Sequence, residues 1–505
     1  MSARGGPADA SAAHGGRPPT GAAQELKRGV TSLGHLALIL SDITPTASLL
    51  VVGTAVVATA GTGSVWSYLI GCFIALNVAL CMGELGSMFP FAGGLFSIVT
   101  RVLGRATGFV AMVDYLAQAV FLPASIAIGI GTYVHVLYPS VPANLVSGFG
   151  MILVTLVALL QIRFNAWLTA VFLAIELLVV IALAVAGFTH LTQPASILTH
   201  PVVAKAGGGL SAIAGGAIVA ALATALFSVN GYDSGINFAE EVLGSSSQVG
   251  RAVVTGASLG IICEIVPFVA IVFGAKNLPA FLASATPLTA GAKQDLGQTF
   301  VTLIIVGALI AIFNASIAIT LQFSRIVWAT GRDRAWPEPI STWIAKVDGK
   351  RGAPWVATLF VGALATALCF QASLIAVVTF TAVLLIVLYG LIAISALVSR
   401  VRQRGLPRPS RLPFWPVPPL LALAGVIVAL TQQKATDLEG IAALFVAGLL
   451  YYFVVVARHP DRYWTVPGAI KDLGGGEGEG EGRSGAGPPR PAPPRPGVPG
   501  PSAGA

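Results

Sequence analysis

The chain has 505 residues, of which 55% are hydrophobic and only 10% are charged, and its formal net charge is +8. A soluble protein of this length would have far too little polar surface to cover its core, so most of the chain must be dissolved in lipid. The composition excludes a soluble enzyme. The positive charge is expected to serve contact with a membrane surface rather than with nucleic acid.

The two ends of the chain differ from the rest. Residues 1–28 are rich in Ala, Gly and Pro and contain no early hydrophobic run, so we expect a disordered cytoplasmic tail rather than a cleavable signal peptide. Residues 459–505 are expected to form a second cytoplasmic tail, which is disordered from about residue 473 because its Gly, Glu and Pro repeats cannot bury a core. Residues 29–458 then form one integral-membrane domain.

Twelve apolar stretches follow one another within this domain, and each is long enough to cross about 30 Å of hydrocarbon as a helix. They cover approximately residues 33–59, 64–89, 107–136, 143–162, 166–188, 211–240, 250–274, 299–328, 354–371, 374–399, 414–431 and 438–457. The sequence therefore predicts an all-α polytopic membrane protein with about 12 transmembrane helices and short loops.

The arginines indicate the orientation of these spans. If the N-terminus is cytoplasmic and the twelve spans alternate, all 21 arginines lie on the cytoplasmic side, as the positive-inside rule requires. Both termini are then cytoplasmic, and we expect a multi-pass protein of the plasma membrane. Anionic lipid headgroups are the expected partners of the loop arginines.

The first span is interrupted near its middle by the run from Ser41 to Ser48 (SDITPTAS). Pro45 removes a backbone donor, and the preceding Thr44 is pushed toward extended geometry, so we expect local unwinding. A simple proline kink is the alternative.

The sixth span is interrupted by the run from Phe227 to Gly235 (FSVNGYDSG). Interruptions five helices apart, in halves of inverted topology, indicate a substrate site between them. Free amides after Pro45 favour an anion, and free carbonyls in the sixth span favour an ammonium group. The expected substrate-binding residues are Thr46, Ala47 and Ser48 in the first span and Phe227, Ser228, Asn230 and Asp233 in the sixth.

The ionisable residues at membrane depth are nearly all acidic, namely Asp42, Asp114, Glu176, Asp233 and Glu264. Such groups usually face a cavity or a pathway. We expect Glu176 or Asp42 to exchange protons during transport, although a neutral Glu176 bonded to Thr or Ser of the first helix is the alternative. Sodium coupling through Ser316 and Thr320 is disfavoured because hydroxyls on apolar helices usually bond to their own preceding turn.

Four stretches resemble motifs of the amino acid/polyamine/organocation (APC) superfamily of permeases. They are the run from Gly83 to Gly94 (GELGSMFPFAGG), the sixth-span run NGYD at 230–233 with Glu240-Glu241, the run from Phe323 to Asp333 (FSRIVWATGRD) with WP at 336–337 and GAP at 352–354, and the turn Thr46-Ala47-Ser48. This resemblance implies two inverted five-helix repeats with broken first and sixth helices, plus two extra helices.

The resemblance also implies a secondary transporter of amino acids or related amines that works by alternating access. Glu240 and Glu241 are expected either to form a gate with Arg325 or to end a solvated helix, and Glu84 is expected to bond Arg101 or Arg105. Two departures leave substrate and coupling open: Thr46-Ala47-Ser48 replaces a glycine-rich turn, and Glu176 stands where some members carry a lysine that mimics sodium.

Other function classes are less compatible with the sequence. An intramembrane enzyme would need a metal cluster or a Ser/His dyad at depth, whereas the six histidines lie in tails, in loops or near span ends, so we expect no catalytic residues, metal or cofactor. A channel would need repeated selectivity loops. An exchanger and a non-transporting nutrient sensor remain alternatives to a proton-coupled carrier.

Overall fold

The computed structural model describes residues 29–90, 93–160, 162–205, 209–243, 245–349 and 352–465. The expectations for residues 1–28 and for the segment beyond residue 473 concern residues outside these ranges.

A helix covers most of each predicted apolar stretch. In chain order these helices are α1 (Ser32–Ile43) continued by α2 (Pro45–Ala47), the π-helical turn η1 (Ser48–Val52) and α3 (Gly53–Ala60); α4 (Ser64–Met88); α6 (Arg105–Leu137); α7 (Ala143–Ala158); α8 (Ile162–Thr189); α10 (Gly215–Ala220) with α11 (Leu222–Ser228) and α12 (Ser234–Asn237); α13 (Ser246–Gly274); α15 (Pro287–Arg332); α17 (Trp355–Gln371); α18 (Leu374–Arg402); α19 (Val417–Leu430); and α20 (Ala435–Tyr451) with η4 (Tyr452–Val456).

Length and composition mark these helices as membrane segments. Within the described ranges, seven helical stretches are long and apolar enough to cross a membrane alone, and the shorter apolar helices have 10–17 residues. Large apolar side chains on their outer faces are exposed, such as Phe149, Leu178 and Leu450. Such exposure is costly in water and favourable in lipid. The protein is therefore an all-helical multi-pass membrane protein.

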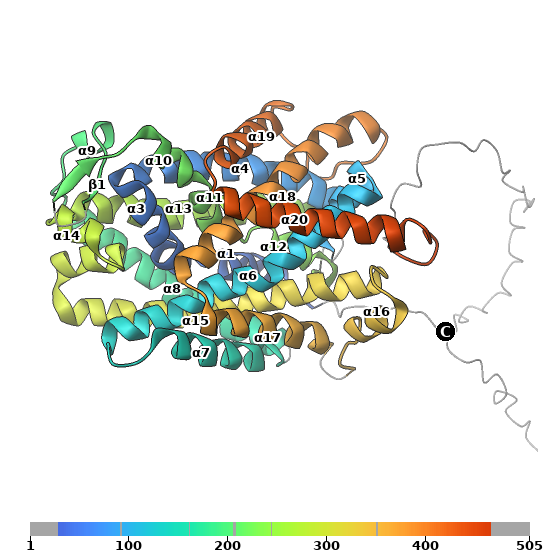
Figure 1. The fold of residues 1–505 in the computed structure, drawn as a ribbon, viewed down its shortest axis with the longest axis horizontal. Coiled ribbons are helices and arrows are strands. Elements are labelled where there is room, and N and C mark those ends of the chain that lie inside the picture. Colours follow the sequence, from blue (N-terminus) through green and yellow to red (C-terminus); the bar gives the residue numbers. More distant parts are fainter. Residues whose placement is uncertain are drawn as a thin grey trace, which may run out of the picture. The chain divides into compact units, whose positions relative to one another are not determined.

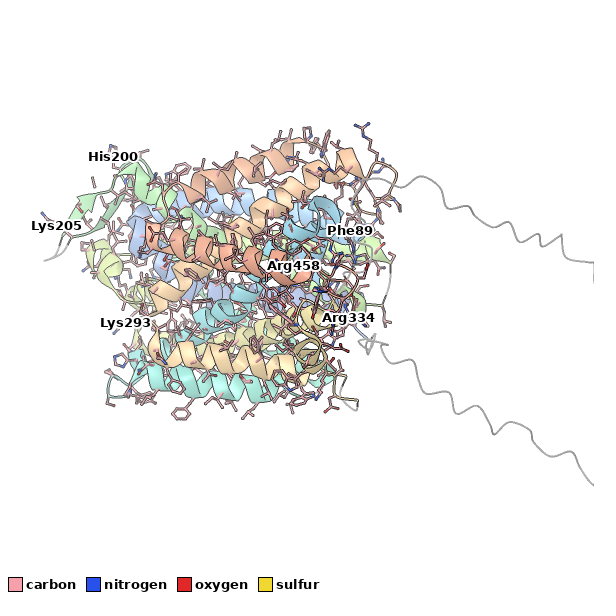
Figure 2. All side chains as sticks on the ribbon, turned by 45° about the vertical axis from the view of Figure 1, so that its right-hand side comes forward. Phe89, His200, Lys205, Lys293, Arg334 and Arg458 are labelled. Atoms are coloured by element: carbon pink, nitrogen blue, oxygen red, sulfur yellow. The ribbon has the colours of Figure 1, made fainter. Side chains whose placement is uncertain are left out.

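The loops gather at two ends of the helix bundle, as an alternating path requires. Figure 2 shows His200, Lys205 and Lys293 at one end and Arg334 and Arg458 at the other. We call the second one the arginine end.

Segments far apart in sequence meet at the arginine end. Arg105 donates to the carbonyls of Pro460 and Tyr463, and the backbone N–H of Trp464 donates to the carbonyl of Arg334 over 2.9 Å. Because the Trp464 side chain is also buried, the chain stays packed against this end through residue 465 rather than leaving it at residue 459.

Short elements between the apolar stretches or at their ends were not predicted. They are α5 (Gly94–Leu103), α9 (Ser196–Thr199), α14 (Leu278–Ala283), α16 (Glu338–Ile344), the 3₁₀ turns η2 (Gly61–Gly63) and η3 (Ala239–Glu241), and an antiparallel hairpin of β1 (Val202–Ala204) and β2 (Leu210–Ala212). The hairpin is a small exception to the all-α prediction. It lies at the end opposite the arginine end, over the turn after α3, where Thr62 accepts a hydrogen bond from the N–H of Val202.

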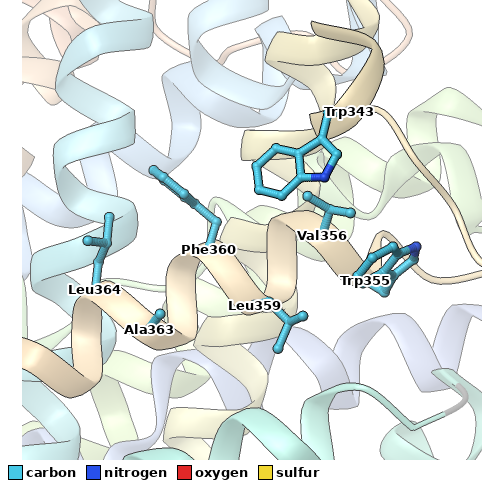
Figure 3. A pocket seen from close by; sticks show the side chains of 7 residues that line it. All are labelled: Trp343, Trp355, Val356, Leu359, Phe360, Ala363 and Leu364. Atoms are coloured by element: carbon cyan, nitrogen blue, oxygen red, sulfur yellow. The ribbon is translucent and has the colours of Figure 1, made fainter. Parts of the chain in front are cut away.

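An apolar groove lies between α16 and α17 (Figure 3). Its volume is about 280 Å³, and it is lined by Trp343 of α16 and by Trp355, Val356, Leu359, Phe360, Ala363 and Leu364 of α17. Because these side chains offer almost no polar atoms, the groove is not suited to a zwitterionic or charged ligand.

Candidate functional site

The first break is confined to one residue. Thr44 has φ 50° and ψ 64°, so it is left-handed, whereas α1 ends at Ile43 and α2 begins at Pro45. The local interruption predicted from Pro45 is present, but the predicted extended geometry of Thr44 was wrong. A left-handed residue also avoids the right-handed region that proline excludes. It lets the helix resume at once, since the N–H of Ser48 donates to the carbonyl of Thr44 over 2.9 Å.

The second break covers residues 229–233, between α11 and α12, and it touches the first. Gly231 has φ +116°, and a Cβ built on it would lie 2.5 Å from the backbone N of Ile43 and 2.6 Å from the backbone C of Asp42. Only glycine allows this approach without strain. The two interruptions therefore meet backbone to backbone at the centre of the bundle, where α1 and α12 lie side by side (Figure 1).

The first break is bonded to a carboxyl group of the protein itself. The N–H of Thr46 donates to Oε1 of Glu176 over 3.0 Å, and the Thr46 hydroxyl donates to the Glu176 carbonyl over 2.8 Å. Glu176 lies on α8 and is fully buried. In this conformation its carboxyl group occupies one of the amides that we expect to hold a substrate anion. The contact also matches the alternative in which Glu176 bonds to Thr of the first helix.

A second carboxyl group lies against the other break. The Ser228 hydroxyl, at the end of α11, lies 2.6 Å from Oε2 of Glu264 on α13 and 2.7 Å from the Tyr68 hydroxyl on α4. All three side chains are buried. Ser228 thus links the helix break to two neighbouring membrane helices.

Asp233 lies in a polar cluster on the arginine-end side of the second break. Its Oδ2 accepts hydrogen bonds from the Tyr115 hydroxyl and from Nε2 of Gln322, the latter over 3.0 Å. Asn237 donates in turn to the Tyr115 oxygen over 2.8 Å. Asp42 interacts electrostatically with Asp233. Asp42, beside the first break, and Asp233, in the second, therefore lie near one another, and neither is bonded to a Lys or Arg within the described part of the chain.

The structure gathers the predicted binding residues around the two touching breaks. Thr46, Ala47, Ser48, Phe227, Ser228, Asn230 and Asp233 are all buried. Asn230 also accepts a hydrogen bond from Tyr389 over 2.7 Å.

Several polar residues of the site were not predicted as site residues. They are His35, Tyr68, Tyr115, Gln322 and Tyr389, and each hydrogen-bonds to a residue of the second break or of the helix ends beside it, within residues 228–235. A sequence signal was available, because a Tyr or Gln within an apolar span needs a polar partner when it is buried. It could not indicate which partner.

The predicted contact between Glu241 and Arg325 is present. Arg325 donates to both carboxyl oxygens of Glu241 through Nε and Nη2, and its Cζ lies 4.7 Å from the centre of the Phe238 ring. Both charged side chains are buried. Glu240 pairs instead with Arg332 over 2.9 Å. Beyond the end of α15, burial raises the pKa of Asp333, and its contact with Arg332 opposes that rise.

The expected partners of Glu84 were wrong. Its carboxyl group accepts hydrogen bonds from Arg400 over 2.5 and 2.9 Å, from Arg408 over 2.7 Å and from the N–H of Leu412 over 2.8 Å. The end of α18 supplies Arg400, and the loop between α18 and α19 folds back against the end of α4 and supplies Arg408 and Leu412. Arg101 instead donates to Ser97 over 2.7 Å.

The hydroxyls of α15 bond to their own helix, as predicted. Ser316 donates to the Ile312 carbonyl over 2.8 Å, and Thr320 donates to the Ser316 carbonyl over 2.6 Å. Both hydroxyl protons are used within the helix.

A multi-pass helical bundle in which two interrupted helices meet, surrounded by buried polar side chains, has the architecture of a secondary transporter. Comparison with known proteins identifies the family: residues 32–456 match the family profile described as amino acid permease. This chain belongs to that family, so it is a membrane transporter rather than an enzyme, and the family implies amino acid substrates.

Individual relatives are distant but cover most of the chain. An uncharacterized transporter of Mycobacterium tuberculosis is 26% identical over 396 residues, which are 78% of this chain and 84% of the relative. The branched-chain amino acid permease BcaP of Lactococcus lactis is 25% identical, over 86% of this chain and 95% of the relative. The aromatic amino acid transport protein AroP of Escherichia coli is 24% identical, over 68% and 74%.

Proposed function

We propose that this protein is a secondary active transporter that moves amino acids or related amines across the plasma membrane by alternating access. The observation that carries the proposal is the close backbone approach between Gly231 and the Asp42–Ile43 peptide, since it brings the two broken helices together at one point. The proposed fold has twelve crossings: two inverted five-helix repeats, with the first and sixth spans broken, followed by α19 and α20.

The substrate is held between the two breaks in this proposal. Backbone amides at Thr46, Ala47 and Ser48 bind its carboxylate, the Ser48 amide after release from the Thr44 carbonyl. Carbonyls around Phe227, Ser228 and Asn230, together with Asp233, bind its ammonium group. Because Glu176 bonds to the Thr46 amide in the present conformation, an incoming carboxylate has to displace it. Displacement by substrate would link binding to a change at a buried acid.

Proton coupling is the proposed driving force, with Glu176 or Asp42 as the group that titrates. Glu176 contacts the segment after the first break directly, and Asp42 lies in the last turn of α1, two residues before Thr44. The test is uptake of radiolabelled L-leucine and L-phenylalanine into proteoliposomes with an inward proton gradient. Glu176→Gln and Asp42→Asn are each expected to retain counterflow exchange. The variant at the coupling residue loses stimulation by the gradient, and unchanged pH dependence in both would overturn the assignment.

The proposed orientation places both termini and the arginine end in the cytoplasm, next to anionic lipid headgroups. Glu240, Glu241 and Arg325 then form a cytoplasmic gate. The support is their position: the buried Glu241–Arg325 pair lies just after α12, the helix that follows the second break, and joins this segment to α15. Opening the pathway toward the arginine end requires this pair to separate or to move as a unit.

The names of the relatives guide the choice of substrates to test. BcaP and AroP favour branched-chain and aromatic amino acids, whereas the acids near the breaks favour a cationic group. A thermal-shift screen with L-leucine, L-phenylalanine, L-arginine and putrescine compares these classes, because a bound ligand raises apparent stability. Net uptake without a counter-substrate distinguishes a symporter from an exchanger. Binding without uptake or counterflow would indicate a sensor.

A further inference from the structure

Glu264 is a buried acid that the proposed transport mechanism leaves unused. The bonds around it have a direction, because Ser228 carries a single hydroxyl proton. If that proton is donated to Glu264, then Tyr68 must donate its own proton to Ser228. The other oxygen of Glu264, Oε1, has no hydrogen-bond partner among the described residues, and the side chain is fully buried.

Glu176 has the same pattern at the other break. Its Oε1 accepts the N–H of Thr46, and the backbone of Ala47 and the side chain of Asn314 also interact with its carboxyl group. Its Oε2 is buried without a partner at hydrogen-bond geometry within the described part of the chain. A carboxylate in this state would be a charge in a low-dielectric interior with half of its acceptors unused, which is expensive. The arrangement suits a carboxylic acid that can hold a proton on its free oxygen.

The two acids also interact with one another. α8 and α13 pack together, and the carboxyl groups of Glu176 and Glu264 repel each other when both are ionised. The other titratable groups that face Glu264 in the described structure are Tyr68 and Cys72 of α4 and the adjacent Cys263. None of these is a cation, so nothing there compensates a double negative charge, and the pair resists losing both protons.

We propose that Glu176 and Glu264 form one proton-carrying pair that contacts both helix breaks and responds to substrate bound between them. Glu176 is coupled to the first break by its hydrogen bond from the Thr46 amide, and Glu264 is coupled to the second break by its hydrogen bond from the Ser228 hydroxyl. The chemical step is the loss of one proton from a carboxylic acid O–H to water, with the electron pair left on the carboxylate. This inference rests on the proposed transport function and adds Glu264, Ser228 and Tyr68 to it.

The logic of coupling follows from these bonds. Substrate at the breaks competes for the Thr46 amide and shifts the carbonyls beside Ser228, so it changes the hydrogen bonds received by both acids at once. Fewer donors to a carboxylate favour its protonated form. Proton affinity and substrate affinity are therefore linked, and by reciprocity a proton on the pair must alter substrate binding.

The first experiment does not depend on transport. Infrared difference spectroscopy of the full-length protein in lipid, recorded across a pH series, detects the C=O stretch of a buried protonated carboxyl group. We expect a titrating band that Glu264→Gln removes or shifts and that Glu176→Gln also alters. Ser228→Ala should move the band to higher frequency, because a carbonyl that loses its hydrogen-bond donor is stiffened.

The control is Asp114→Asn. Asp114 is a buried acid of α6 that accepts a hydrogen bond from Gln118 of the same helix over 2.9 Å, and within the described residues it has no hydrogen bond to either break. The titrating band should persist in this variant. A wild-type spectrum without a titrating carboxyl band, or a band unchanged in both glutamine variants, would overturn the proposed pair.

The second experiment measures L-leucine movement in proteoliposomes. Glu264→Gln should keep counterflow exchange within about threefold of the wild type and lose accumulation driven by a pH gradient. Gradient-driven accumulation unchanged in Glu264→Gln contradicts its role. If the wild type moves no leucine or other tested amino acid, the transport proposal fails, whereas the infrared result still decides whether the two acids share a proton.

Discussion

Individual residues decide where the two helices break and how closely they approach. Thr44 adopts a left-handed conformation that a β-branched residue rarely takes, with a cost of about 1–3 kcal/mol. Gly231 has the complementary role, since its missing side chain leaves room for the peptide between Asp42 and Ile43. Strain on one break and open space on the other together create the contact on which the candidate site depends.

Substitution of Gly231 tests that contact. In Gly231→Ala, the new methyl group would lie within 2.7 Å of three backbone atoms of Asp42 and Ile43, at a φ that alanine disfavours. We expect a loss of stability of at least about 1–3 kcal/mol, seen as a lower thermal unfolding midpoint in detergent, and loss of L-leucine uptake. The control is Gly215→Ala, because a Cβ there meets nothing within 4 Å. Wild-type uptake by Gly231→Ala would show that the breaks need not touch.

The Glu241–Arg325 pair provides a second test at this scale. The Glu241 side chain is only 3% exposed and that of Arg325 only 1%, so Glu241→Ala leaves a buried guanidinium group without its counter-ion. The substitution should lower the free energy of unfolding by about 3–5 kcal/mol. The matched control is Glu338→Ala. Glu338 is 74% exposed and its partner Arg462 is 61% exposed, so Glu338→Ala should lower the free energy of unfolding by less than about 1 kcal/mol. Equal thermal unfolding midpoints of the two variants would show that the buried pair contributes no more to stability than the exposed one.

At the scale of elements, hydropathy was a sufficient guide to the membrane helices but not to their contacts. Lipid demands long apolar helices, so all twelve predicted stretches contain one. The breaks were predictable because Pro45 and the glycines around Asn230 disrupt helices by known mechanisms. The hairpin β1–β2 was not, since it lies beyond the apolar spans and has no hydropathy signal.

Contacts between elements depend on the fold and cannot be read along the chain. Glu176 is 130 residues from Thr46, and Glu84 is 316 residues from Arg400. Sequence proximity favoured Arg101 and Arg105 as partners of Glu84, but the loop after α18 lies nearer in space. The location of the candidate site and the bonding of Glu176 to the first helix were therefore predictable, whereas the contact of Glu264 on α13 with Ser228 needed the structure.

Glu84 allows a test of how elements are joined at the arginine end. It bonds the end of α18, through Arg400, and the loop that follows, through Arg408 and Leu412, to the end of α4. Glu84→Gln removes the negative charge that attracts Arg400 and Arg408, so the loop should open more often. We expect trypsin to cleave after Arg402, Arg404 or Arg411 several-fold faster than in the wild type. The exposed Glu439 of α20 supplies the control, Glu439→Gln, in which cleavage should not change. Equal cleavage of both variants would rule out this role of Glu84.

At the scale of the whole molecule, the distribution of charge relates the bundle to the membrane. The excess of positive charge is gathered at one end, where loops from the whole length of the chain pack together through Arg105, Arg332 and Arg400. A membrane whose cytoplasmic leaflet is anionic favours this end inside. The other end carries the β1–β2 hairpin and a few lysines.

Cysteine labelling tests this orientation directly. In a variant whose four native cysteines are replaced by serine or alanine, Lys205→Cys places a thiol after β1, and Thr342→Cys places one on α16; both positions are exposed. A membrane-impermeant maleimide should label residue 205 in intact cells and residue 342 only after the membrane is permeabilised. The reverse pattern would invert the proposed topology and move the Glu241–Arg325 gate to the outer face. Labelling of both positions in intact cells would contradict the alternating path of the spans, because α16 and the hairpin would then share one side of the membrane.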